Sequence, residues 1–117
     1  MATYTKKTLS GSSQGQAIKV AATSSPGTLI HEGPTRRSYR HEVWLYASNS
    51  DTTARKLTIE WGGANNVLEL TVPAEGGLAL LIPGLIIDRN DPALTIRAFC
   101  ATADVISLYG YIGEMTD

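Results

Sequence analysis

The chain has 117 residues, a formal net charge of −1 and 43% hydrophobic residues, which fits one globular domain large enough to bury its own core. Its single cysteine excludes an intrachain disulfide, and its isoelectric point near 6.1 is too low for a typical nucleic-acid-binding protein. The longest apolar stretch, residues 78–87, is well short of the ~20 residues of a membrane-spanning helix. We therefore expect neither nucleic acid nor membrane as a partner, and we interpret this stretch as a buried strand followed by a turn at Pro83 and Gly84.

Positive and negative charges are separated along the chain. Residues 1–56 contain eight Lys and Arg against three Asp and Glu, whereas residues 57–117 contain two against eight. Such a chain can make complementary contacts with a second copy of itself or with an oppositely charged partner. Alternatively, strand pairing interleaves the two halves and evens out the charge over the folded surface.

Residues 1–16 form a polar N-terminal segment that we expect to be an extended arm. The stretch TLSGSSQGQ (residues 8–16) has too little apolar surface to become ordered by itself, so a neighbouring subunit is expected to hold the arm. The segment also lacks the apolar run of a signal peptide, so we expect synthesis in a cytoplasm. Residues 17–117 are predicted to form a single β-sandwich domain.

The rest of the chain consists of short strand-like runs separated by turns. The turns contain glycine, asparagine and proline, which allow or impose the backbone angles that turns require. Short strands separated in this way are typical of an all-β fold, here an antiparallel β-sandwich or jelly-roll-like barrel with at least six strands. The predicted strands are residues 17–22, 28–31, 39–47, 55–61, 67–72, 78–82, 93–100 and 105–112.

The alternation of side chains predicts which faces of these strands are buried. In the run of residues 55–61, Leu57, Ile59 and Trp61 share one face, which we expect in the core, and the polar residues between them share the other. In the run of residues 39–47, an aliphatic face alternates with a face of polar and aromatic side chains.

Aromatic and basic residues make up the expected partner interface. Amphipathic aromatic side chains on the less aliphatic faces favour contact with another surface, although a core that uses both faces of its sheet is an alternative for Trp44. The arginines around Tyr39 suit ion pairs with carboxylates across a protein interface better than contacts with phosphates. The expected interface consists of Lys6, Lys7, Arg36, Arg37, Arg40, Trp44, Tyr46, Tyr109 and Tyr111.

No pattern in the sequence indicates an enzyme, a cofactor or a metal site. His31 and His41 are each followed by glutamate but do not continue as H-E-x-x-H, and adjacent residues of a strand point to opposite faces, so neither pair can hold one ion. We expect each histidine to be a solvated or hydrogen-bonded residue at a strand end. The sequence has no G-x-S-x-G nucleophile motif, and we expect Cys100 to be a small buried side chain.

Two motifs near the C-terminus carry a resemblance to a known class of proteins. The runs LTIRAFC (residues 94–100) and VISLYGYIG (residues 105–113) form a predicted closing hairpin, after a polar arm and a compact sandwich. This layout resembles small structural proteins of tailed-bacteriophage virions. The resemblance implies a capsid decoration (cement) protein, made in the host cytoplasm and located in the virion. Such a protein binds the major capsid protein or another virion protein, commonly as a homotrimer.

Two other functions are compatible with the same residues. One is a phage tail, neck or head-fibre component. The other is a carbohydrate-binding β-sandwich module, in which one of the rings of Trp44, Trp61, Tyr109 or Tyr111 stacks on a sugar. A sugar site of this kind needs an exposed ring beside Asp or Asn side chains in a concave place, so the exposure of these rings would distinguish it.

Overall fold

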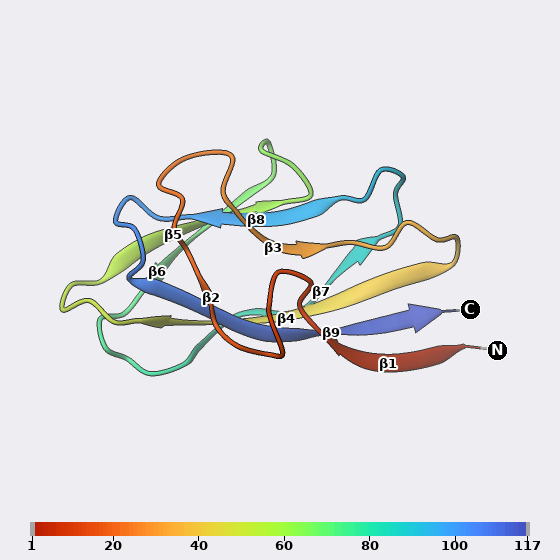
Figure 1. The fold of residues 1–117 in the computed structure, drawn as a ribbon, viewed down its shortest axis with the longest axis horizontal. Coiled ribbons are helices and arrows are strands. Elements are labelled where there is room, and N and C mark those ends of the chain that lie inside the picture. Colours follow the sequence, from red (N-terminus) through yellow and green to blue (C-terminus); the bar gives the residue numbers. More distant parts are fainter. Residues whose placement is uncertain (1, 117) are drawn as a thin grey trace.

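A computed structural model describes residues 2–116, which form nine β-strands and no helix (Figure 1). The strands are β1 (Thr3–Thr8), β2 (Ile18–Lys19), β3 (Thr28–Glu32), β4 (Tyr39–Asn49), β5 (Arg55–Trp61), β6 (Val67–Val72), β7 (Ala79–Asp88), β8 (Thr95–Phe99) and β9 (Ile106–Thr116). The prediction of an all-β fold is confirmed. In this part of the chain, no helix is long and apolar enough to cross a lipid bilayer.

The strands form two antiparallel sheets that pack face to face (Figure 1). One sheet has the order β1-β9-β4-β7, with β2 also paired to β9, and the other has the order β3-β8-β5-β6. β4 and β9 pair along their whole length, from Tyr39 opposite Thr116 to Asn49 opposite Ile106. The architecture is therefore the antiparallel β-sandwich that the spacing of turns predicted.

The core lies between the two sheets and is made by the inner face of each. Val43, Leu45 and Ala47 of β4 are fully buried, as are Leu57 and Ile59 of β5, and these are the aliphatic faces that the alternation predicted. Burial of one leucine or isoleucine side chain contributes about 1.5–3 kcal/mol. A slip of one residue in either strand would turn this whole face outward, so the aliphatic pattern fixes the register.

The other face of β5 is also covered, contrary to the expectation from the sequence. Thr58 and Glu60 are only 5% and 3% exposed, and the loop before β3 reaches over this face. The Glu60 carboxylate accepts hydrogen bonds from the Ser25 hydroxyl (2.5 Å) and from the Gly27 N–H (2.7 Å). These donors replace the water that a buried carboxylate loses. Trp61 is partly buried and packs against the core.

The N-terminal segment differs from the loose arm that its composition suggested. Residues Thr3–Thr8 form an edge strand that pairs with β9 of the same chain, from Thr3 opposite Thr116 to Thr8 opposite Tyr111. All six side chains of β1 are exposed, so the strand is held mainly by its backbone, which needs no apolar sequence. Leu9 is 1% exposed, so the chain joins the core before residue 17, where the sequence had placed the start of the domain.

The apolar stretch of residues 78–87 is only partly buried, and no turn breaks it. Ile82 and Ile87 are 3% and 2% exposed, so the expected burial holds for these two side chains, whereas the expected turn at Pro83 and Gly84 was wrong. The stretch lies in β7, an edge strand that continues through Pro83 and Gly84 to Asp88. Two register shifts in its pairing with β4 absorb the proline, and Gly84 adopts a φ of 84° that a glycine tolerates. Several of its apolar side chains face solvent, with Leu80 49% exposed and Ile86 43% exposed.

Candidate functional site

The outer face of the β1-β9-β4-β7 sheet brings together the aromatic residues that the sequence selected. Trp44 and Tyr46 of β4 lie directly opposite Tyr111 and Tyr109 of β9. They alternate with the buried core residues of the same strands and therefore lie on the outer face of the sheet. Four rings from two strands thus form one surface, which we call the aromatic face.

The indole of Trp44 is held in place from several sides. Its ring is stacked on that of Tyr111, with the centroids 6.1 Å apart and the planes 11° from parallel. Its Nε1–H donates a hydrogen bond of 2.7 Å to Glu42 Oε1. The backbone of Gly84 passes so close that a Cβ there would lie 3.0 Å from Cζ2 of the indole. A ring fixed in this way loses little conformational entropy when it binds a partner.

Strand β1 extends the aromatic face on one side. The hydroxyl of Tyr4 donates to the same Glu42 oxygen, at 3.0 Å, and this hydrogen bond to a carboxylate raises the pKa of Tyr4 above its ordinary value. The ammonium of Lys6 lies 5.1 Å from the centroid of the Tyr111 ring, at cation–π distance. The rim of the aromatic face therefore carries one carboxylate, which holds two aromatic donors, and one cation.

Strand β7 extends the same surface on the other side with aliphatic residues. Leu80 lies opposite Tyr46 and Ile86 opposite Glu42, so both belong to the outer face. Together with Tyr109, which is 38% exposed, they leave apolar side chains uncovered on β7 and β9, on either side of the partly buried Trp44 and Tyr46 of β4. Uncovered apolar surface of this kind, rimmed by polar groups, marks binding sites in soluble proteins.

The basic residues of the expected interface do not all join the aromatic face. Lys7 points away from Lys6 and forms an ion pair of 2.9 Å with Glu114. The guanidinium of Arg36 lies 5.0 Å from the centroid of the Tyr39 ring, in the loop before β4. Arg37 of the same loop is exposed, and Arg40 is exposed at the start of β4. The structure thus divides the expected interface between the aromatic face and one end of the sandwich.

That end of the sandwich holds a buried pair of histidines that the sequence did not predict. His31 belongs to β3 and His41 to β4, so they come from different sheets, and their Nε2 and Nδ1 atoms are 2.8 Å apart. They are 3% and 7% exposed, so the expectation of solvated residues was wrong, whereas the alternative expectation of hydrogen-bonded residues is confirmed. One signal was available, since His41 has the same parity along its strand as the core residues Val43 and Leu45.

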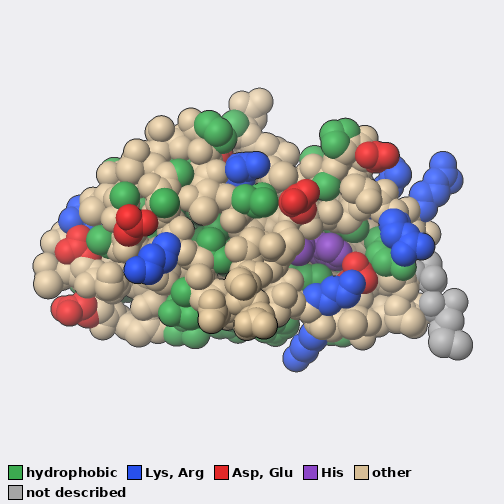
Figure 2. All heavy atoms as spheres, in the orientation of Figure 1, with side chains coloured by type: hydrophobic (Ala, Val, Ile, Leu, Met, Phe, Trp, Pro, Cys, Tyr) green, Lys and Arg blue, Asp and Glu red, His purple; other side chains and the backbone are tan. Residues whose placement is uncertain are grey.

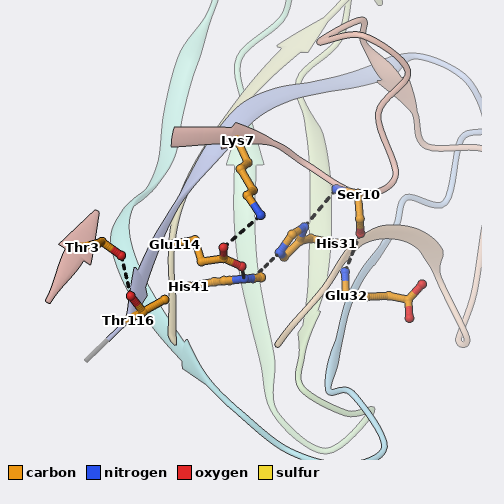
Figure 3. Close-up of polar contacts among 8 residues, drawn as sticks. All are labelled: Thr3, Lys7, Ser10, His31, Glu32, His41, Glu114 and Thr116. Atoms are coloured by element: carbon orange, nitrogen blue, oxygen red, sulfur yellow. Dashed lines mark hydrogen bonds and ion pairs between the residues drawn. The ribbon is translucent and has the colours of Figure 1, made fainter. Parts of the chain in front are cut away.

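The histidine pair is part of a longer chain of polar contacts (Figure 3). The backbone N–H of Ser10 donates to His31 Nδ1 at 3.0 Å, and His41 Nε2 lies 3.0 Å from Glu114 Oε2. The other oxygen of Glu114 binds the ammonium of Lys7. We call Lys7, Ser10, His31, His41 and Glu114 the polar chain. It joins the segment around β1 to both sheets.

Burial and charge shift the pKa values within the polar chain. Burial disfavours the imidazolium of His31, and a charge on His41 adds to the effect, so the pKa of His31 falls from 6.5 to about 4. Burial alone would raise the pKa of Glu114, but the hydrogen bonds from Lys7 and His41 outweigh it and lower the value below 4.5. At neutral pH the pair of histidines is therefore next to an ionised Glu114 that already has two partners.

A hollow of about 370 Å³ opens beside the polar chain, between β1, β4, β9 and the loop before β4. Figure 2 shows histidine (purple) recessed there beside Lys or Arg (blue) and Asp or Glu (red) side chains. The hydroxyl of Ser10 does not contact an imidazole but accepts the N–H of Glu32 at 2.7 Å, so it is not arranged as an activated nucleophile. Among residues 2–116, no group of three His, Cys, Asp or Glu side chains is placed to hold a metal ion.

A second hollow, of about 400 Å³, lies at the ends of β5 and β7. Its lining combines the ring of Trp61 with Asn66 and Asp88, and its remaining walls are glycine and aliphatic side chains. The carbohydrate-binding alternative required an exposed ring beside Asp or Asn in a concave place; the hollow has the amide and the carboxylate, but its ring, Trp61, is partly buried. The other three rings of that alternative, Trp44, Tyr109 and Tyr111, lie instead on the aromatic face.

Comparisons with known proteins leave the family of this chain open. No family model matches the sequence, and no curated protein matches it. Among solved structures, the chain is similar to the exo-β-1,3-galactanase of Phanerochaete chrysosporium determined with galactose. The TM-score is 0.41 and the sequence identity 17%, and the match covers 99% of this chain but only 26% of the galactanase chain. A likeness of this size does not assign the chain to a family.

Proposed function

We propose that this chain is a structural protein that decorates an assembled bacteriophage capsid, and that it binds the shell through the aromatic face. The observation that carries the proposal is one surface in which the exposed side chains of Tyr109, Leu80 and Ile86 flank the partly buried rings of Tyr46 and Trp44. The resemblance of residues 94–113 to small virion proteins supplies the choice of partner. The geometry supplies the surface.

The composition of the aromatic face suits a protein interface. Tyrosine and tryptophan dominate the energetics of interfaces because they bury much area with few rotatable bonds, and Trp44 is already fixed by Glu42 and Tyr111. Lys6, at the rim, adds a positive charge suited to an acidic side chain of the partner. A ligand that binds the assembled lattice and not its free subunits stabilises the lattice by mass action.

Co-sedimentation with purified phage particles tests the proposal. We expect the wild-type protein to sediment with empty heads and not with isolated tails, and to form a trimer in sedimentation velocity. Tyr109→Ala should weaken binding to heads about tenfold or more, as expected for an interface residue of large energetic weight. Leu68→Ala is the matched control, because Leu68 is 36% exposed but lies in the other sheet.

Binding to tails alone would support a tail or neck component instead. No binding of the folded wild-type protein to either particle, or equal binding by the Tyr109 and Leu68 variants, would contradict the use of the aromatic face.

A second candidate function is the binding of a carbohydrate in the hollow that contains Trp61. The observation that favours it is the concave site itself, whose volume is of the size that holds one or two sugar rings. Asn66 and Asp88 would supply hydrogen bonds to hydroxyl groups, and Trp61 a stacking surface. Glycan binding that is lost in Asn66→Ala and retained in Asn65→Ala would support this candidate, since Asn65 is exposed and does not line the hollow.

A further inference from the structure

The polar chain fastens the N-terminal strand to the rest of the fold. Lys7 lies within β1, and Ser10 lies two residues after the end of β1. Lys7 binds Glu114 at one end of the row of His31, His41 and Glu114, and Ser10 binds His31 at the other end (Figure 3). No side chain of β1 is buried, so the strand depends on its backbone pairing with β9 and on a few surface contacts. Any change in the polar chain therefore acts on a weakly held element.

The hydrogen bonds of the polar chain allow one arrangement of protons. The Ser10 N–H can only donate, so His31 Nδ1 must be the acceptor, and the proton of a neutral His31 is on Nε2. That proton is donated to His41 Nδ1, which places the proton of a neutral His41 on Nε2, facing Glu114. With both rings neutral, every contact from Ser10 to Glu114 is satisfied, and all donors point in the same direction.

An additional proton on either ring breaks this arrangement. On His31 the proton must go to Nδ1, where it faces the Ser10 N–H, and two donors then oppose each other. An additional proton on His41 goes to Nδ1, which then becomes a donor. His31 Nε2 can accept this hydrogen bond only if the proton of His31 moves to its own Nδ1, where it faces the Ser10 N–H. Otherwise the contact between the two rings is lost. Whenever a proton occupies Nδ1 of His31, the link that fails is the one from Ser10, which holds the chain just after β1.

We propose that His31 and His41 act as a proton-operated latch on β1, so that uptake of one proton by the pair releases Thr3–Thr8 and uncovers the edge of β9. His41 and Lys7 bind the two oxygens of the same carboxylate, so a positive charge on the histidine pair lies close to the Lys7 ammonium and weakens the second anchor of the strand by repulsion. The latch does not depend on the proposed capsid-binding function, because it concerns the attachment of β1 to its own domain.

The charged groups around His31 and His41 also favour the release of β1 when the pair takes up a proton. Lys7 of β1 and Arg36 of the loop before β4 line the same hollow, so an additional positive charge on the histidines repels both. Tyr39 and Glu114 are the other titratable groups there. On the remaining elements, Ile96 of β8 lies opposite His31 and Ile87 of β7 opposite His41, and neither bears charge. The pKa of His31 near 4 places the midpoint of proton uptake by this ring near pH 4, so its contribution to the release develops at the acidic end of the range.

Hydrogen exchange at a series of pH values from 7.5 to 3.5 tests the latch. After correction for the intrinsic pH dependence, we expect exchange in residues 3–8 to rise about fivefold to tenfold, the effect of one lost hydrogen bond. Residues 106–110 of β9, which pair with β4 and lie outside the register of β1, should keep their protection. In the double variant His31→Gln/His41→Gln, whose side chains form hydrogen bonds but do not titrate in this range, the rise should be absent.

The control variant Glu114→Gln separates the histidines from the carboxylate. It removes the ion pair with Lys7, so β1 should exchange faster at every pH, but the rise at low pH should remain. Constant protection of residues 3–8 in the wild type, or an unchanged rise in the double histidine variant, would overturn the proposal.

A second measurement does not depend on the folding of any variant. The ring signals of His31 and His41 in NMR spectra of the wild-type protein report their titration, and the amide signals of residues 3–8 report the release of β1. We expect the amide changes to share a midpoint with one of the two rings. Amide changes at a pH where neither ring titrates would refute the latch.

Discussion

The indole of Trp44 lies against Gly84, and a Cβ on that glycine would approach Cζ2 and Cε2 of the ring to 3.0 and 3.2 Å. The two residues belong to neighbouring strands and meet where the pairing of β4 and β7 shifts its register. The position of the main aromatic side chain of the face thus depends on the absence of a side chain at one position of the edge strand.

Gly84→Ala should displace Trp44 and destabilise the protein by about 2–3 kcal/mol. About 1–2 kcal/mol comes from the left-handed backbone, since φ is 84° at this residue, and the rest comes from contact with the indole. Gly77→Ala is the matched control, because Gly77 has a φ of 74° but no atom within 4 Å of a Cβ. Urea unfolding followed by tryptophan fluorescence measures both. Equal losses in the two variants would show that Trp44 adapts without cost.

The stability of the folded chain should decrease in mild acid because of His31. The pKa of His31 is about 4 in the folded chain, below the ordinary 6.5, so the contribution of the neutral ring to the free energy of unfolding is fully present above pH 6.5. As the pH falls from 6.5 to 4, the unfolded chain binds the proton first, and the free energy of unfolding decreases by about 3 kcal/mol.

Urea titrations at pH 7.5, 6, 5 and 4 measure this decrease. His31→Gln should flatten the curve above pH 4.5, where the carboxyl groups with lowered pKa values, Asp51 and Glu114, still retain their charge. A curve of unchanged slope in the variant would assign the acid sensitivity to other groups.

Glu60→Gln should destabilise the sandwich by about 1–3 kcal/mol. The carboxylate of Glu60 accepts hydrogen bonds from Ser25 and Gly27 and is 3% exposed. The amide of a glutamine can still accept from the Gly27 N–H and donate to the Ser25 hydroxyl, but neither hydrogen bond is then assisted by a charge, so both are weaker. Glu69→Gln is the control, since that side chain is 57% exposed and pairs only with Lys56 at the surface. Thermal unfolding compares the two. A loss no larger than that of the control would mean that the charge of Glu60 adds nothing to these two hydrogen bonds.

Two glycines of β9 should respond differently to alanine. A Cβ at Gly113 would meet the ring of Tyr4 at 2.3 Å, and that side chain, which is 49% exposed, can swing away. We expect a loss of about 1 kcal/mol and a loosened β1. A Cβ at Gly110 would lie 2.1 Å from the backbone oxygen of Trp44, so the pairing of β4 with β9 must shift, at a cost of about 3 kcal/mol or more. Calorimetric melting of the two variants tests this order, and the reverse order would contradict it.

The sequence predicted those parts of the fold that depend on alternation along a single strand. The buried faces of β4 and β5 follow from the period of two at Val43, Leu45, Leu57 and Ile59, and so does the shared side of Trp44 and Tyr46. The bounds of β4, β5 and β6 differ from the predicted ones by at most two residues.

Contacts between distant segments could not be predicted in the same way. β1 is held by its backbone, and backbone pairing leaves no mark in a polar sequence. The pair of His31 and His41 forms because two strands of different sheets face each other, and nothing local to either residue states which strands do so. Glu60 is buried by a loop more than thirty residues earlier, as the contacts with Ser25 and Gly27 show. The pairing of β1, the contact between the histidines and the burial of Glu60 all depend on which strands and loops the topology places side by side.

The middle of β7 affects whether further chains can add to this edge of the sheet at high protein concentration. An open sheet edge lined by leucine and isoleucine is a template on which further chains can add strands and grow into fibrils. Pro83 has no N–H to offer such a strand, and the register shifts beside Gly84 bend the edge away from a straight ladder. Leu80, Leu85 and Ile86 therefore lie uncovered on an edge whose backbone disfavours the addition of further strands.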